Sequence, residues 1–167
     1  MGLITLEVLG MAHIDVRAMD ASAKVRLADE IFAQQPNLLA AMLVLQRYGV
    51  TMVQLEVPLH VLFVTFRAMK RSGHRWPTIT EDVQDKCLQR LTGRVRFTEG
   101  LPPELVEQVV NQHCNEHPER QLLAFAYGYL GEHDLLGARS EAEKYLTLAV
   151  LNLVECVAFV GAQIQAG

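Results

Sequence analysis

The chain has 167 residues, of which half are hydrophobic and a fifth are charged, and its formal net charge is −4. A chain of this length typically forms one domain and buries roughly 70% of the surface that its unfolded form exposes. The composition excludes a disordered protein. The acidic balance argues against a dedicated nucleic-acid-binding protein, because such domains usually have a high isoelectric point. We therefore expect an ordinary globular protein, and the patterns below predict a single helical domain over residues 1–167.

The cysteines point to a reducing compartment. Cys87, Cys114 and Cys156 are odd in number and widely spaced, so they indicate neither a disulfide framework nor a thiol-rich zinc site. The N-terminus has no basic residue before its apolar stretch and no small-residue cleavage site, which argues against a secretory signal. We expect a cytoplasmic protein, and residues 1–10 are a candidate for a loosely attached leader ahead of an internal start at Met11.

A helical period runs through most of the chain, beginning with two helices separated by a short break. Asp20 or Ser22 caps a helix that runs to Gln35. Pro36 then fits the first turn of a second helix, which Gly49 closes in a left-handed conformation.

The third predicted helix is one of the two most apolar segments. Thr51 caps it, and apolar residues follow in alternating steps of three and four: Met52, Leu55, Leu59, Leu62, Phe66 and Met69. A strand is the alternative over residues 51–57, where apolar and polar residues alternate. We favour a helix, because the pattern extends far beyond a typical strand of about 5 or 6 residues. Pro58 is expected to kink this helix.

Four further helices complete the predicted fold. Their boundaries come from caps and breakers: Thr80 to Gly93, a helix opened by Pro102 and Pro103, one from Pro118 to Gly131, and a last one capped by Ser140 and Glu143. Residues 94–101 are expected to form an exposed connector or a short strand. The predicted fold is all-α, a single-domain bundle of six or seven helices with a long apolar C-terminal helix.

Polar groups lie near the middle of both apolar segments. Glu56 and His60 are one helical turn apart in residues 51–66, and Asn152 and Glu155 share one stripe in residues 145–164. Carboxylates are rarely buried without a partner, so we hypothesise that the four side chains form one hydrogen-bonded cluster. The alternatives are a structural network that sets helix register, two separate pairs that reach solvent, a subunit interface, or a pocket for a small ligand or metal.

Neither apolar segment is expected to cross a membrane. A central acidic residue costs on the order of 3 kcal/mol on insertion scales, and each segment contains a glutamate near its middle. The first segment is also interrupted by Pro58. We interpret both segments as core helices.

One string matches a catalytic signature. His113, Glu116 and His117 follow the HxxEH order of the inverted zinc peptidases, a mechanism that needs both histidines on one helical face and an acidic third ligand from elsewhere. Pro118 disfavours helical dihedral angles at His117, which should splay the two imidazoles apart. We therefore predict no metal here, and expect His117 to help cap the next helix.

A basic stretch interrupts this acidic chain. Between Arg67 and Arg96, eight basic residues stand against three acidic ones. Their charges could pair with acidic residues of the C-terminal half, or they could bind an anionic partner. The predicted partner-binding residues are Arg67, Lys70, Arg71, Arg75, Trp76, Arg90, Arg94 and Arg96.

The sequence thus predicts an intracellular helical protein-interaction or regulatory domain, which binds an acidic partner through this basic surface and forms a homodimer through its long apolar helices. The alternative is a helical-bundle enzyme or a small-ligand or metal binder, with Glu56, His60, Asn152 and Glu155 lining a central pocket. In that alternative a buried glutamate would act as a base. No cofactor is predicted, and nucleic acid is the least favoured partner.

Overall fold

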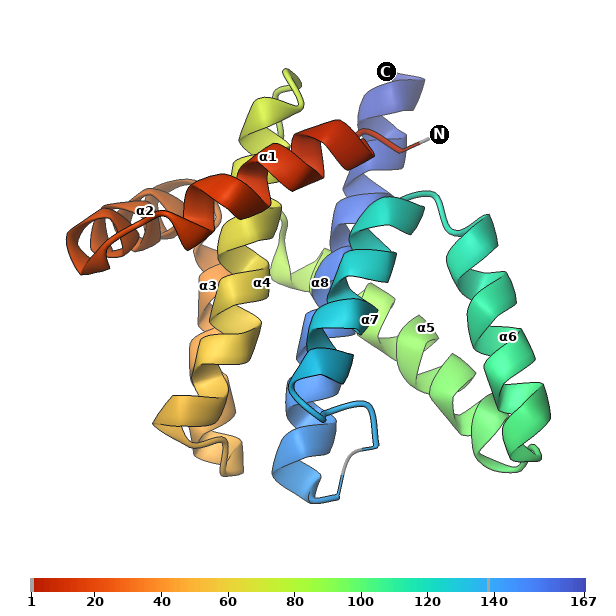
Figure 1. Cartoon of the computed structure of the whole chain (residues 1–167). Helices are drawn as coiled ribbons and strands as arrows, with labels where there is room; N and C mark the ends of the chain where they lie inside the picture. Colours follow the sequence, from red (N-terminus) through yellow and green to blue (C-terminus); the bar gives the residue numbers. More distant parts are fainter. Residues whose placement is uncertain (1, 138) are drawn as a thin grey trace.

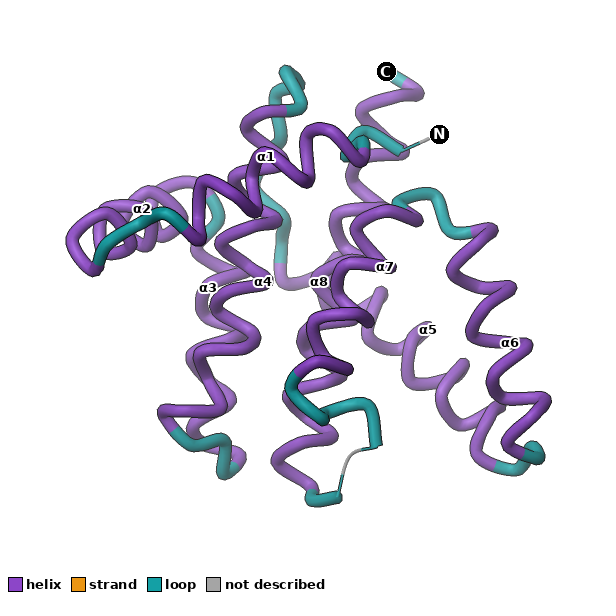
Figure 2. The backbone as a smooth tube through the Cα atoms, in the orientation of Figure 1, coloured by secondary structure: helices purple, strands orange, loops and turns teal. Residues whose placement is uncertain are grey.

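A computed structural model of the protein describes residues 2–137 and 139–167, without the side chains of residues 97 and 98. Over these residues the chain is helical and contains no strand (Figure 2). In chain order the elements are α1 (Leu6–Arg17), α2 (Ala21–Gln34), α3 (Pro36–Leu43), the 3₁₀ helix η1 (Val44–Tyr48), α4 (Met52–Arg71), α5 (Glu81–Glu99), α6 (Pro103–Glu116), α7 (Arg120–Glu132) and α8 (Glu141–Ala166). The all-α prediction is confirmed, and the described part of the chain has eight α-helices where six or seven were expected.

The two most apolar helices, α4 and α8, form the centre of the fold. They contact each other, and both also contact α3 and α7. α1 lies across α4, while α5 contacts α8 and runs obliquely away from it (Figure 1). Val61, Leu62 and Val64 of α4 and Val150 and Val154 of α8 are almost completely buried. The prediction that both segments are core helices agrees with this packing.

Both central helices also have the length and hydropathy of membrane-spanning helices. The core helices of other folds pass the same test, and here 56% of each apolar window is buried within the protein. Burial in this fold therefore accounts for part of their apolar character.

α4 is capped as its sequence suggests. The Thr51 hydroxyl accepts the N–H of Gln54, while the Gln54 side chain accepts the N–H of Thr51. This reciprocal capping box satisfies two amide groups at the start of the helix. The strand alternative for residues 51–57 is wrong, and Pro58 lies buried inside the helix.

Two predicted helix boundaries are corrected. α5 does not end at Gly93 but continues to Glu99, so the expected connector or strand over residues 94–101 is helical for most of its length. A glycine inside a helix costs only about 1 kcal/mol relative to alanine, too little to stop a helix that its flanking residues favour. The helix predicted from Pro36 changes to a 3₁₀ helix at Val44, before Gly49 closes it with the expected left-handed φ of 95°.

The start of the N-terminal segment is packed against the fold. Leu3 and Ile4 are 9% and 2% exposed, and their N–H groups donate to the carboxylate of Glu119 at 2.6 and 3.1 Å. Helix α1 then starts at Leu6. It has no clean apolar stripe, because Leu6 and Ile14 point to solvent, which is why periodicity missed this eighth helix.

α6 is only loosely packed against the rest of the fold. It contacts α7, and none of its described side chains is buried. Figure 1 shows α5 and α6 diverging from the body of the protein and meeting at their far ends. The space between them and the central helices is where the candidate site lies.

Two glycine substitutions should change stability in opposite directions. Gly49→Ala places a side chain at positive φ and should destabilise the protein by about 1–2 kcal/mol. Gly93→Ala lies in the middle of α5, where a Cβ would meet nothing within 4 Å, and should stabilise by about 0.5–1 kcal/mol. Urea unfolding measures both. If Gly93→Ala also destabilises, α5 does not continue through this position.

Candidate functional site

The side chain of Glu155 collects partners from three other segments. Its carboxylate lies in the middle of α8 and is 10% exposed. Oε1 accepts from Nη1 of Arg94 in α5 at 3.1 Å and lies 3.4 Å from Nε2 of His113 in α6. Oε2 lies 3.3 Å from Nε2 of His117, immediately after α6. We call Glu155, Arg94, His113 and His117 the carboxylate hub.

His113 and His117 reach the same carboxylate although a proline follows. His117 has the extended ψ of 138° that Pro118 imposes, but its φ of −65° is helical. The φ angle sets the direction of the Cα–Cβ bond relative to the preceding helix, whereas ψ sets the direction of the chain that follows. The helical φ therefore keeps the His117 ring near His113, and the extended ψ turns the backbone away after it. The ring centroids are 5.2 Å apart. The prediction that the imidazoles splay apart is therefore wrong.

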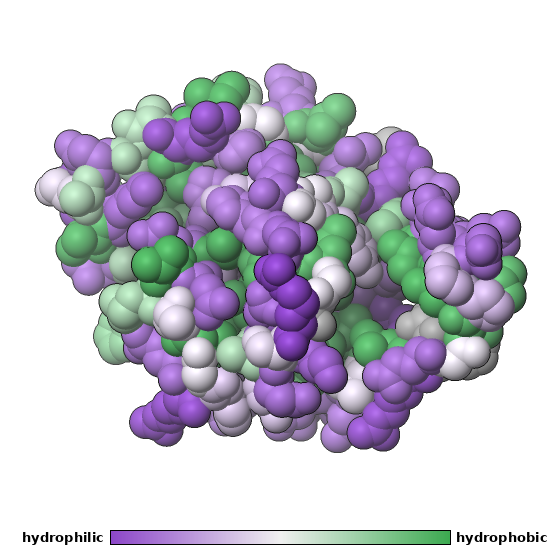
Figure 3. Space-filling view, turned by 60° about the horizontal axis from the view of Figure 1, so that its bottom comes forward, coloured by the Kyte–Doolittle hydropathy of each residue, from purple (hydrophilic) through white to green (hydrophobic). Residues whose placement is uncertain are grey.

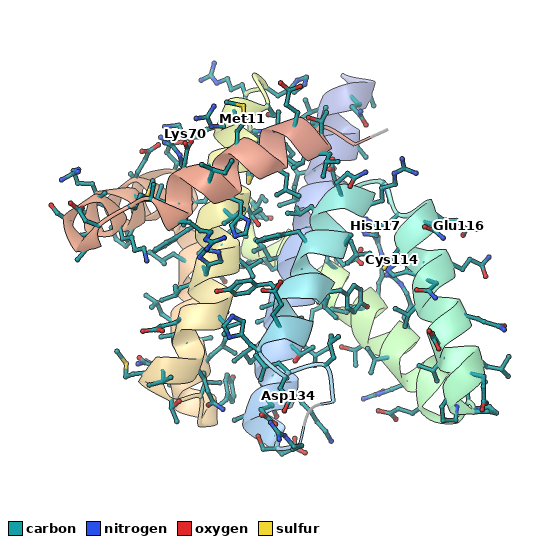
Figure 4. The ribbon with its side chains drawn as sticks, viewed as in Figure 1. Met11, Lys70, Cys114, Glu116, His117 and Asp134 are labelled. Atoms are coloured by element: carbon teal, nitrogen blue, oxygen red, sulfur yellow. The ribbon has the colours of Figure 1, made fainter. Side chains whose placement is uncertain are left out.

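The proton position on His117 follows from its neighbours. The N–H of Glu119 donates to Nδ1 at 3.0 Å, so Nδ1 carries the lone pair. The proton of the neutral ring must then lie on Nε2, from which it is donated to Glu155. His117 thereby joins the start of α7 to the middle of α8, in keeping with its expected role near the start of the next helix. Figure 4 shows His117 and Glu116 where α6 ends and the chain turns into α7.

The hub fixes its own ionisation. Burial favours the neutral carboxyl, but hydrogen bonds from His117 and Arg94 outweigh it and hold the pKa of Glu155 at about 2. Burial and the charge of Arg94 lower the pKa of His113 below its usual value. At neutral pH the hub therefore contains one carboxylate, one guanidinium and an uncharged His113.

A cavity of about 640 Å³ opens beside the hub, between α5, α6, α7 and α8. Figure 3 shows a hollow with hydrophobic side chains on its walls, next to the lobe at the right. Arg94, His113 and Glu155 lie on its wall. The other lining residues are mostly apolar and include Leu91, Val95, Val109, Val110, Leu123 and Leu151, together with Arg90, Gln112, Glu116 and Tyr127.

His113, His117 and Glu155 also have the composition of a metal site. One potential ligand atom from each lies within 4.8 Å of the others, and nitrogen and carboxylate ligands suit zinc. However, Nη1 of Arg94 lies 3.0 Å from Nε2 of His113 and 3.1 Å from Glu155, so a cation already sits between two of these atoms. A metal-bound histidine donates from its other nitrogen, whereas Nδ1 of His117 accepts. His113, His117 and Glu155 could therefore bind a metal only if Arg94 moved away and Nδ1 of His117 no longer accepted the N–H of Glu119.

Glu155 is one of four residues that the sequence placed in a single polar cluster, and the structure separates them. Glu56 is exposed. His60 stacks on Tyr129 of α7 at 4.6 Å and lies edge-on to His13 of α1. Nδ2 of Asn152 donates to the main-chain oxygen of Gln84 in α5. These side chains therefore do not form one hydrogen-bonded cluster.

The predicted basic surface is also divided. Arg67 and Arg71 pair with Asp15 of α1, and Lys70 pairs with Glu30 of α2. The remaining members lie on the loop after α4 or on α5. In that group Arg90 stacks over Phe159 at 5.5 Å, Arg94 belongs to the hub, Trp76 donates to the Ser72 hydroxyl, and Arg75 and Arg96 are exposed. In the described part of the chain, four of the eight predicted residues thus form ion pairs: Arg67, Lys70, Arg71 and Arg94. Most of their acidic partners lie near the N-terminus.

Replacing the hub carboxylate should be costly. Glu155→Gln turns the oxygen pair that accepts from Arg94 and His117 into an amide that can accept at one atom only. We expect a loss of about 2–4 kcal/mol in unfolding free energy. Glu116→Gln is the matched control, because Glu116 is exposed and accepts from Gln112; it should change stability by less than about 0.5 kcal/mol. Equal effects in urea unfolding would contradict the hub.

His60 should make the protein acid-sensitive. Burial, with the nearby charges of His13, Lys24, His133 and Arg17, lowers its pKa to about 4, and its Nε2 has no hydrogen-bond partner among the described residues. The unfolded chain therefore takes up a proton near pH 6.5 that the folded chain resists, so stability falls as pH drops from about 6.5 towards 4. His60→Phe keeps the ring stack and should flatten this dependence. Parallel pH profiles for the two proteins would refute the assignment.

Comparison with known proteins supplies no relative. No protein-family model matches the chain, and neither a curated protein nor a solved structure matches it significantly. The function is therefore argued from the geometry of the hub and the cavity beside it.

Proposed function

We propose that this protein binds a small molecule with an apolar body and an anionic group in the cavity beside the carboxylate hub. The observation that carries the proposal is the combination of a mostly apolar hollow of about 640 Å³ with convergent polar groups on one wall. Ligand pockets typically have volumes of roughly 300–1,000 Å³ and this composition. Perturbed titratable groups such as Glu155 also gather at functional sites.

The apolar wall of the cavity supports the proposal that the ligand has an apolar body. Leu91 and Leu123 are nearly buried and form part of its base. Val109 and Val110 of α6 face the same space and are only half-buried. An apolar ligand body would cover these side chains, and burial of apolar surface contributes roughly 25 cal/mol per Å².

Arg94 supports the proposal that the ligand carries an anionic group. Its bonds to His113 and Glu155 both use Nη1, and its side chain is 44% exposed. Nε and Nη2 are the donors best suited to a ligand, because a guanidinium recognises a carboxylate or phosphate with two parallel N–H groups. Glu155 holds the guanidinium in place beforehand, which lowers the entropy lost on binding. Arg90 lines the same cavity and adds a second positive charge.

The proposal combines parts of both sequence-based hypotheses. It keeps a small-ligand site, although of the four residues predicted to line it only Glu155 does so. It also keeps an anionic partner, recognised by Arg90 and Arg94 of the predicted basic surface. We propose binding without a reaction, because no nucleophile stands beside a base in the hub. The homodimer and the cytoplasmic location stay predictions.

The ligand class is tested with decanoate and decanol, which share an apolar chain and differ in the anionic group. Calorimetric titration should show that the protein binds decanoate about 10- to 100-fold more tightly, the range that a charged hydrogen bond contributes. Arg94→Gln should reduce this preference to less than about threefold. Arg96→Gln removes an exposed arginine from the same helix outside the cavity and should leave the preference unchanged.

A third variant tests the cavity itself. Val109→Trp fills the apolar space from the half-buried wall without touching the hub, so it should weaken both ligands together by tenfold or more. Thermal unfolding of each variant confirms that it is folded. The proposal fails if the wild-type protein binds both ligands equally, or if Arg94→Gln retains the full preference for decanoate.

A further inference from the structure

We infer that Tyr127 of α7 is a second binding residue of the proposed site, and that its hydroxyl donates to the same anionic group of the ligand as Arg94 does. The head group of the ligand is then an oxyanion with two or more oxygen atoms, such as a carboxylate or a phosphate. This inference rests on the proposed function, because it concerns the ligand of the cavity beside the hub. It adds a residue that belongs neither to the hub nor to the predicted basic surface.

The surroundings of Tyr127 place its phenol in the cavity. The residue is half-buried and lines the cavity wall. The groups that act electrostatically on its hydroxyl come from the three other helices around the cavity: Arg94 of α5, Cys114 of α6 and Glu155 of α8. A hydroxyl that belongs to α7 and lies near these three helices points into the space between them.

The hydroxyl of Tyr127 has a donor to offer. In the part of the chain that the structure describes, it makes no hydrogen bond, and it is not one of the completely buried atoms without a partner. It therefore keeps access to the cavity. The nearby carboxylate of Glu155 already accepts from Arg94 and His117, so a ligand is the acceptor that the phenol lacks.

The phenol keeps its proton at neutral pH. Burial, together with the nearby Cys114 and Glu155, raises the pKa of Tyr127 to about 12. The group is therefore a neutral O–H donor that does not repel an anion. A hydrogen bond to an ionised acceptor is roughly twice as strong as one between neutral groups. An anionic ligand thus gains more from Tyr127 than a neutral ligand does.

Arg94 and Tyr127 can hold one head group together. Nη1 of Arg94 is engaged in the hub, which leaves Nε and Nη2 for the ligand. An ionised carboxylate has about four lone-pair positions, enough for two N–H groups of the guanidinium and the O–H group of the phenol. The head group is thereby held from α5 and from α7, while the apolar body lies against the apolar wall.

Tyr127→Phe tests the inference, because it removes the hydroxyl and keeps the ring. At neutral pH, calorimetric titration should show that this variant binds decanoate about tenfold more weakly than the wild-type protein does, and decanol less than about threefold more weakly. Tyr129→Phe is the matched control, since it removes a hydroxyl from the same helix outside the cavity. It should leave both affinities unchanged.

The outcomes separate the inference from the proposed function. If the wild-type protein prefers decanoate and Tyr127→Phe binds decanoate equally well, the proposed function stands and the inference is wrong. Equal losses for decanoate and decanol would assign Tyr127 to the apolar wall alone and would also overturn the inference. A wild-type protein without a preference for decanoate would overturn both.

A measurement on the wild-type protein covers the case in which Tyr127→Phe fails to fold. Nuclear magnetic resonance follows the Cζ atom of Tyr127, which carries the hydroxyl, in protein with isotope-labelled tyrosine. Its resonance should shift at saturating decanoate by clearly more than at saturating decanol. Equal shifts, or an unmoved resonance at saturating decanoate, would show that the hydroxyl does not donate to the oxyanion and would refute the inference.

Discussion

One buried carboxylate ties together the part of the fold that contains the proposed site. Glu155 receives Arg94 from α5 and the two histidines from α6 and its end, and His117 in turn accepts the N–H of Glu119. The Glu119 carboxylate then accepts the N–H groups of Leu3 and Ile4. Burial raises the pKa of Glu119, and its two backbone hydrogen bonds oppose that effect. A continuous chain of hydrogen bonds thus connects the N-terminal segment to α5, and each link satisfies a group that would be costly to bury alone.

The same network explains why a cavity exists at all. Helices normally approach until their apolar faces are in contact, but α6 has no buried side chain and meets the central helices mainly through His113, His117 and its contact with α7. Polar contacts at one end of α6 therefore set its distance from α5 and α8. The apolar side chains farther along both helices are left facing a hollow. The hub both holds the cavity open and provides its polar wall.

The sequence predicted the local features well and the tertiary ones poorly. Asp20, Thr51 and Ser140 cap their helices as expected, because capping depends on a few neighbouring residues. α1 was missed because its exposed Leu6 and Ile14 obscure the apolar stripe. The HxxEH string pointed to an acidic partner from elsewhere in the chain for His113 and His117. However, the sequence also predicted that these two imidazoles would diverge, so it did not identify Glu155 as that partner. No spacing within α8 indicates that α5 will supply Arg94, since that choice depends on how two helices pack.

Asn152 and Glu155 show that two residues on the same side of a helix need not share hydrogen-bond partners. The two residues are three apart on α8 and so lie on one side of it, which suggested a shared cluster. However, α5 packs against α8, and it places Gln84 beside Asn152 and Arg94 beside Glu155. One helix therefore supplies different partners to the two polar residues of the stripe, so a shared side of α8 predicts neighbours on α8 but not a shared hydrogen-bonded cluster.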